Sequence, residues 1–135
     1  MVTKQYQKSK GSQFEYECVD NLKKVFEPFA EVYLTKERGF QRQFDIEIIT
    51  KLEGDTPLSI AVECKKHKSI SWNQARKWFE KLEQKATAHS EHWLLMTYNR
   101  QPVVLMGRSE GIVVMLEAEE YLSTLTRSEV KWTRR

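Results

Sequence analysis

The sequence is poor in the residues that mark secreted, membrane-bound or zinc-stabilised proteins. It has two cysteines, Cys18 and Cys64, and neither stands in a CxxC or Cys/His spacing, which argues against a disulfide framework or a zinc site. No apolar run approaches the length of about 18 residues that a transmembrane helix needs. The first ten residues, MVTKQYQKSK, lack the apolar segment of a signal peptide. We therefore expect a cytoplasmic (intracellular) protein with no membrane contact, phage or viral origin being one option, and with reduced thiols in its core.

Internal repeats, low-complexity tracts and the signatures of helix-turn-helix or zinc-finger modules are also absent from the sequence. The chain has 135 residues, of which 40% are apolar and 30% are charged, which is ordinary for a globular protein. This length suffices for one core and hardly for two. We expect a single domain over residues 1–135, with residues 1–10 as a mobile basic arm and residues 126–135 as a basic tail.

The net charge of +3 says little about nucleic acid, but its distribution says more. Residues 65–81 hold six Lys or Arg against one Glu, and residues 127–135 hold four against one. Lys8 and Lys10 precede the first acidic residue, Glu15. Positive charge is therefore concentrated in the middle of the chain and at both ends.

Residues 42–66 have the pattern of a β-hairpin. Apolar and polar residues alternate on both sides of residues 51–57, a connection that contains the turn formers Gly, Asp and Pro. If the hairpin is symmetric about Gly54, residues whose numbers sum to 108 face one another. Asp45 then lies opposite Glu63, about 5 Å away on the same sheet face, with Lys65 roughly 7 Å further along the strand.

Two carboxylates this close repel one another unless a proton or a cation lies between them. Oxygen ligands at this spacing suit Mg²⁺ or Mn²⁺, and a nearby lysine can orient or deprotonate a water molecule. The alternative is a solvated sheet face with cross-strand charges. The pattern alone leaves both interpretations open.

Residues 12–26 are expected to form a helix that ends before Pro28. Glu15 lies on its inward apolar stripe, three and four residues before Cys18 and Val19, whereas Glu17 is expected to face water. A carboxylate on the buried side needs a reason. Ser12-x-x-Glu15 has the spacing of a capping box, and a role in a catalytic or metal site is the alternative.

The remaining elements complete an α/β pattern. We expect a strand at residues 29–35, a turn at 36–39, a helix at 71–88, a strand at 92–98, a second hairpin at 102–116 whose first half could be a short helix, and a closing helix at 117–125. These elements predict a mixed central β-sheet flanked by helices on both faces. Trp132, in the tail, is expected to pack on a partner subunit or to stack on a base.

Several polar side chains are candidates for contact with phosphates or with the site. Gln74 has the spacing to cap the helix at residues 71–88 together with Ser71, and His67 is expected to be a general base or to be solvated. Simple exposure is the alternative to phosphate contact for Arg38 and Arg42. The candidate DNA-binding residues are Lys8, Lys10, Arg38, Arg42, Lys66, Lys68, Arg76 and Lys77.

Asp45 followed by Glu63-Cys64-Lys65 resembles the signature of the PD-(D/E)XK nuclease superfamily, although Phe44 stands where the family has proline. KGSQFEYE at residues 10–17 is similar to the opening helix of archaeal-type Holliday-junction resolvases, whose catalytic glutamate would fall on Glu15. AVECKKHKSISW at residues 61–72 and the apolar run at 111–116 look equally like Mrr-type restriction nucleases. The resemblance implies a restriction-endonuclease-like fold.

The resemblance also implies a reaction. Asp45, Glu63 and Glu15 would hold Mg²⁺ or Mn²⁺, Lys65 would activate the attacking water, Gln74 would orient the site, and hydrolysis of the phosphodiester would leave a 5′-phosphate. The absence of a sequence-reading module favours recognition of DNA by shape, and so a homodimeric Holliday-junction resolvase acting on four-way junctions. An Mrr-type restriction or repair endonuclease is the first alternative, and a non-cutting DNA-binding protein on the same fold is the second.

Overall fold

A computed structural model describes the backbone of residues 2–39, 43–50, 58–98 and 101–135, and within these ranges the side chains from residue 13 onwards. Three helices and six strands follow one another along the chain, with a short 3₁₀ helix after the first strand. They are α1 (Val2–Phe26), β1 (Ala30–Leu34), η1 (Thr35–Arg38), β2 (Ile46–Thr50), β3 (Ser59–His67), α2 (Trp72–Lys85), β4 (Glu91–Tyr98), β5 (Val104–Ser109), β6 (Ile112–Glu117) and α3 (Ala118–Thr126).

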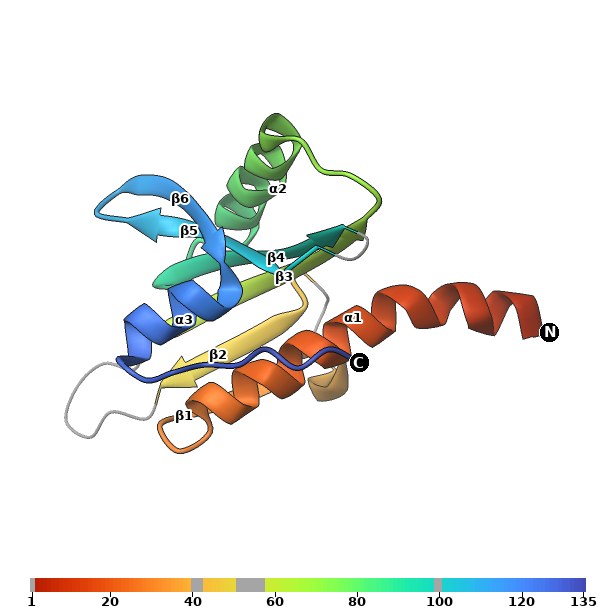
Figure 1. Ribbon diagram of the computed structural model, residues 1–135, viewed down its shortest axis with the longest axis horizontal. Coiled ribbons are helices and arrows are strands. Elements are labelled where there is room, and N and C mark those ends of the chain that lie inside the picture. Colours follow the sequence, from red (N-terminus) through yellow and green to blue (C-terminus); the bar gives the residue numbers. More distant parts are fainter. Residues whose placement is uncertain (1, 40–42, 51–57, 99–100) are drawn as a thin grey trace.

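The six strands form one mixed sheet in the order β1-β2-β3-β4-β5-β6. β3 and β4 are parallel, and the other neighbouring pairs are antiparallel. A parallel pair needs a crossover connection, and α2 provides it. Figure 1 shows α2 on one side of the sheet and α1 and α3 on the other. The predicted α/β architecture, a mixed sheet with helices on both faces, is confirmed.

Alternating residues of the central strands face two apolar clusters. Val62 of β3 is buried with the apolar residues of α1, whereas its neighbour Ala61 packs against Leu82 of α2. The same alternation on β4 directs Trp93 toward the α1 side and Leu94 toward α2. Because both of its faces are covered, β4 is almost continuously apolar and buried from Trp93 to Thr97.

The predicted register of the first hairpin is confirmed, since Ile48 pairs with Ile60 and Ile46 with Val62. Its connection, residues 51–57, lies outside the described residues. The strand begins later than expected, because Phe44 leaves the alternation and packs on the α2 side against the cluster that contains Ala61. Asp45 therefore precedes the first residue of β2.

The predicted start of the first helix is wrong, because α1 begins at Val2 and not at Ser12. Residues 2–10, expected as an arm outside the helix, are helical. Gly11 costs about 1 kcal/mol relative to alanine inside a helix, which a helix of 25 residues tolerates. Ser12 is thus an interior residue and cannot form a capping box with Glu15.

The C-terminal segment, residues 127–135, packs along α1 (Figure 1). Trp132 Nε1 donates to Glu17 Oε2 at 2.8 Å, and Asn21 exchanges two hydrogen bonds with the backbone of Thr133. Glu17 and Asn21 are consequently buried, which corrects the prediction that Glu17 faces water. The expectation that Trp132 contacts a partner or a base is replaced by packing within the chain.

The other elements agree closely with prediction. Ser71 caps α2 by accepting a hydrogen bond of 3.1 Å from the backbone N–H of Gln74, and α2 ends at Lys85. Ala75 and Phe79 of α2 are buried as expected, but Trp72 is 45% exposed. The second hairpin is formed by β5 and β6, so the alternative of a short helix at its first half is wrong.

Candidate active site

The β2–β3 hairpin brings Asp45 and Glu63 together, as the register predicts. Asp45 lies next to the Ile46–Val62 pair, and its backbone N–H donates to the Val62 carbonyl at 3.0 Å. A hydrogen bond joins the carboxyl groups of Asp45 and Glu63. The two acids are therefore in direct contact.

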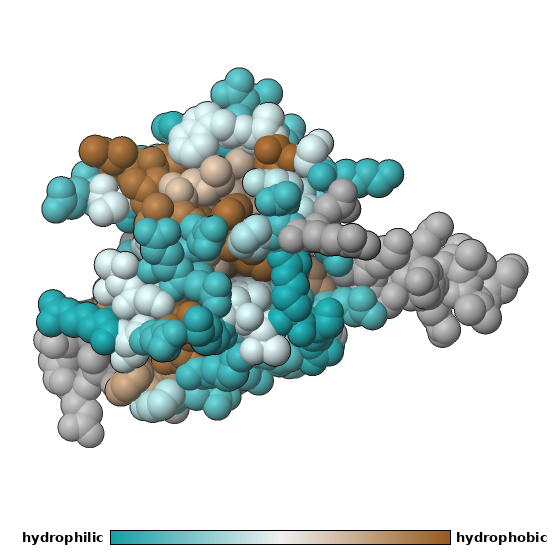
Figure 2. Space-filling model, viewed as in Figure 1, coloured by the Kyte–Doolittle hydropathy of each residue, from teal (hydrophilic) through white to brown (hydrophobic). Residues whose placement is uncertain are grey.

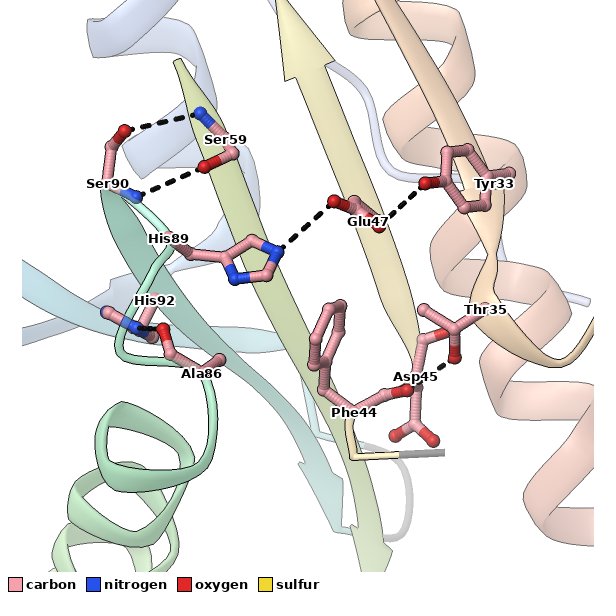
Figure 3. Close-up of polar contacts among 10 residues, drawn as sticks. All are labelled: Tyr33, Thr35, Phe44, Asp45, Glu47, Ser59, Ala86, His89, Ser90 and His92. Atoms are coloured by element: carbon pink, nitrogen blue, oxygen red, sulfur yellow. Dashed lines mark hydrogen bonds and ion pairs between the residues drawn. The ribbon is translucent and has the colours of Figure 1, made fainter. Parts of the chain in front are cut away.

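Thr35, at the start of η1, fixes the backbone on either side of Asp45 (Figure 3). The Thr35 hydroxyl donates to the Phe44 carbonyl at 2.5 Å, and the Thr35 backbone N–H donates to the Asp45 carbonyl at 3.0 Å. Asp45 Oδ2 accepts a hydrogen bond of 2.8 Å from the backbone N–H of Cys64. Main-chain and side-chain bonds together hold this carboxylate in a buried position.

Glu15 reaches the same place from α1. Its carboxyl group is hydrogen-bonded to that of Asp45, and Lys36 Nζ lies 3.2 Å from its Oε2. The side chain of Glu15 is 12% exposed. Because no capping box is formed, the remaining explanation for this inward carboxylate is its contact with Asp45. Its catalytic role stays a prediction.

Burial and mutual repulsion disfavour the charged forms of these acids. Burial raises the pKa of Asp45, and its hydrogen bond with Glu63 raises it further, while the hydrogen bonds with Glu15 and with the Cys64 N–H oppose the rise. Burial also raises the pKa of Glu15, with Asp45 adding to the effect and Lys36 opposing it. The three carboxyl groups are thus linked in the order Glu15, Asp45, Glu63.

Among the described residues, no group of three or more His, Cys, Asp or Glu side chains is arranged to hold a metal ion. Mg²⁺ usually binds one or two carboxylates together with water and substrate oxygens, so a complete protein cage is not required. Asp45 and Glu63 supply hard oxygen donors that repel one another without a cation. The donor chemistry of this pair fits Mg²⁺ or Mn²⁺.

Lys65 lies on the same face of β3 as Glu63, and its ammonium group lies 5.2 Å from the centre of the Trp78 ring on α2. The ammonium group that contacts Glu63 belongs to Lys85, whose Nζ lies 3.3 Å from Glu63 Oε2. Lys85 and Lys36 were both missed from the sequence. A signal for Lys85 existed, because it stands between Leu82 and Ala86 on the inward stripe of α2.

Glu47, the next acid along β2, has a different environment (Figure 3). Tyr33 Oη donates to Glu47 Oε2 at 2.6 Å, and His89 Nε2 lies 3.2 Å from Glu47 Oε1. Burial and the contact with Glu47 raise the pKa of Tyr33. In Figure 3 the carboxylate of Asp45 points away from this network. Both carboxylate oxygens of Glu47 thus contact Tyr33 and His89, and Glu47 is separate from the three linked acids.

For the other predicted site residues, the structure describes contacts elsewhere than with Glu15, Asp45 and Glu63. Gln74 is exposed and contributes its N–H to the Ser71 cap, so capping is the interpretation that the contacts support. His67 is exposed, with its ring 4.9 Å from that of Trp78. Arg38 forms an ion pair with Glu31.

The predicted DNA-binding lysines are exposed where they are described. Lys66, Lys68 and Lys77 are exposed around the end of β3 and the start of α2, and Arg76 is half-buried. Arg42 lies outside the described residues. Lys8 and Lys10 belong to α1, but their side chains are not described. Contact of any of these residues with DNA stays a prediction.

The two thiols meet where α1 packs on the sheet, at a contact that we call the α1–β3 seam (Cys18 and Cys64). Cys18 is buried, Cys64 packs against the same apolar cluster, and the thiols are hydrogen-bonded to one another. Burial raises the pKa of both. Both cysteines are free, Cys18 buried and Cys64 partly buried, and the reduced state of the two thiols stays a prediction.

Comparisons with known proteins give likenesses among solved structures alone. No protein-family model matches the chain, and no curated protein matches it in sequence. Within residues 2–39, 43–50, 58–98 and 101–135, no helix is both long and apolar enough to cross a membrane. Among solved structures, the chain is similar to Hjc, a Holliday junction resolvase from Archaeoglobus fulgidus, with 14% identity and a TM-score of 0.43, over 90% of this chain and 99% of that one. A likeness of this size does not establish a function, which has to be argued from the side chains.

Proposed function

We propose that the chain is a metal-dependent DNA endonuclease that acts on four-way junctions. The observation that carries the proposal is the linked set of three carboxyl groups, Glu15, Asp45 and Glu63, on three different elements. Burial and repulsion raise the pKa of Glu15 and Asp45, so keeping these groups ionised destabilises the folded protein. Such an arrangement is typical of functional sites. A divalent cation at a scissile phosphate would compensate the cost.

Asp45 and Glu63 would hold the ion, which is Mg²⁺ or Mn²⁺ by the chemistry of its donors. The bound ion would supply positive charge that polarises the phosphate. Glu15 would orient Asp45 through their hydrogen bond, and the Cys64 N–H holds Asp45 Oδ2. The oxygen of a water molecule then bonds to phosphorus and the bond to the 3′ oxygen breaks, which leaves a 5′-phosphate and a 3′-hydroxyl group.

Lys65 would steady the negative charge that develops on the phosphate. It projects from β3 two residues after Glu63, with its ammonium group over the Trp78 ring. Around it, the exposed residues Lys66, Lys68 and Lys77 offer a basic surface for the flanking phosphates. Each phosphate contact would make binding more dependent on salt concentration.

Recognition of a junction fits a two-fold symmetric dimer, which presents two sites to two strands of like polarity. The edge strand β6 offers a surface for a second copy. Its side chains Ile112, Met115 and Leu116 are exposed, and Figure 2 shows hydrophobic side chains over the β5–β6 hairpin. Apolar residues exposed on a sheet edge favour association.

The decisive experiment is cleavage of a labelled four-way junction, with a duplex of matching sequence as comparison. In the presence of Mg²⁺ the junction should be cut in paired, symmetric positions and the duplex should remain intact. Equal cutting of both substrates would favour the restriction or repair endonuclease. Binding to the junction without cutting under Mg²⁺ or Mn²⁺ would favour the non-cutting DNA-binding protein.

The first prediction concerns Asp45. Asp45→Asn should lower the cutting rate by at least about 100-fold, because a carboxylate ligand is lost, and it should keep or tighten junction binding, because a charge that repels phosphate is removed. Asp20→Asn is the matched control, since Asp20 lies on α1 and forms an exposed ion pair with Arg135 of the C-terminal segment. Cutting by Asp45→Asn at the rate of the control would show that the site is misplaced.

A further inference from the structure

The linked acids are neutralised at both ends by lysines from other elements. Lys36 Nζ lies 3.2 Å from Glu15 Oε2, and Lys85 Nζ lies 3.3 Å from Glu63 Oε2. Asp45, in the middle, accepts a hydrogen bond from the backbone N–H of Cys64. Two ammonium groups together carry the same charge as one divalent ion, and they contact the outer members of the set that would bind it.

The two lysines differ in how firmly they are held. Lys36 also lies over the Tyr16 ring, at 4.9 Å from its centre, and its side chain is 26% exposed. Lys85 is the last residue of α2 and its side chain is 35% exposed, whereas Glu63 beneath it is 14% exposed. A lysine at a helix end can move its ammonium group into water while its stem stays on the surface.

We propose that Lys85 acts as a built-in counter-ion of Glu63 and competes with the divalent ion, so that this lysine sets the affinity of the site for metal. The inference rests on the proposed function, because it assumes that Glu63 is a metal ligand. Lys85 is then a positioning residue: it holds Glu63 in place in the metal-free protein and leaves when the ion binds. The attraction between the metal ion and Glu63 is partly offset, because the ion pair between Lys85 and Glu63 has to be broken first.

Titration of Mn²⁺ into the metal-free protein by calorimetry tests this without DNA or turnover. Lys85→Gln should bind Mn²⁺ roughly fivefold more tightly than the parent, the upper range for losing a partly exposed ion pair. Lys81→Gln is the matched control, because it removes the same charge from an exposed position one helical turn earlier. Lys85→Arg should restore an affinity close to that of the parent.

The outcomes separate the inference from the proposed function. Equal affinities of the parent and Lys85→Gln, or equal shifts in Lys85→Gln and Lys81→Gln, would overturn the role of Lys85 and leave the metal site intact. No binding of Mn²⁺ by any of the proteins would overturn both. If Lys85→Gln does not fold, as judged by circular dichroism, Lys85→Met, which keeps the straight stem, takes its place with the same expected tightening.

Discussion

Asp45 contacts acids that come from both sides of the sheet. The chain leaves strict alternation at Phe44, which packs on the α2 side, and Asp45 contacts Glu63 on β3 as well as Glu15 on α1. A residue in the middle of a strand would face one side only. Asp45 lies just before the first residue of β2, and this position allows it to contact both Glu15 of α1 and Glu63 of β3.

The raised pKa of Asp45 predicts how stability depends on pH without metal. Because its folded pKa lies above its unfolded value of about 4, the folded state binds the proton more tightly. The resulting stabilisation is fully present below the unfolded pKa and is lost as pH rises through the folded pKa. The difference in the free energy of unfolding between Asp45→Asn and the parent should therefore grow in favour of Asp45→Asn as pH rises through the folded pKa of Asp45, and it should level off above that pKa.

Urea unfolding in the presence of a chelator measures this difference at each pH. Asp20→Asn serves again as the control, and its curve should run parallel to that of the parent. Parallel curves for Asp45→Asn and the parent would mean that the buried carboxyl group has an ordinary pKa in the folded protein.

At the scale of elements, the C-terminal segment stabilises α1. The Trp132 indole donates to Glu17 Oε2, and the Arg135 backbone N–H donates to Glu17 Oε1 at 3.0 Å, so both oxygens of this buried acid depend on the segment. Burial of a carboxylate is unfavourable unless such bonds are made. The segment is thus a part of the fold rather than a solvated tail.

Trp132→Ala should lower the free energy of unfolding by roughly 2 kcal/mol, because a partly buried ring is lost and Glu17 loses a donor. Trp132→Phe, which keeps a ring but loses the indole N–H, should cost about 1 kcal/mol. Trp72→Ala should have a smaller effect than Trp132→Ala, because Trp72 is 45% exposed. Chemical denaturation measures all three, and a larger loss at Trp72 would contradict the packing described for Trp132.

Periodicity predicted the elements well and their packing partners poorly. Alternation fixed the Ile46–Val62 register, and the Ser71 cap could be read directly. The contacts of Lys85 with Glu63 and of Trp132 with Glu17 join distant parts of the chain. The local pattern could indicate that Lys85 faces the sheet, but it could not indicate the partner of either residue. The start of α1 was missed because Gly11 and Ser12 resemble a helix start, although a long helix tolerates them.

At the scale of the whole molecule, assembly is the property on which junction cutting depends. The sheet ends at β6, whose residues Ile112 and Leu116 are 68% and 38% exposed. An unpaired edge with apolar side chains is rarely left open in a monomer. In the proposed function, two sites related by a two-fold axis would give paired cuts, whereas a single site would give single nicks.

Ile112→Glu should shift the protein from dimer to monomer in sedimentation velocity and should replace paired cuts by single nicks, because a charge is placed on the apolar edge. Leu125→Glu, on α3, is the control, since Leu125 is also exposed, at 48%. A parent protein that is monomeric at tens of micromolar would refute the β6 interface. Dimers that persist in Ile112→Glu would move the interface elsewhere.

The thiols of the α1–β3 seam can report on the separation of α1 from the sheet. Cys18 is fully buried and burial raises the pKa of its thiol, so an alkylating reagent reaches it only when α1 separates from the sheet. The same separation would carry Glu15 away from Asp45. Slow alkylation of Cys18, distinguished from that of the partly buried Cys64 by peptide mapping, therefore follows the opening that takes the linked acids apart, in the natural chain and without any introduced label.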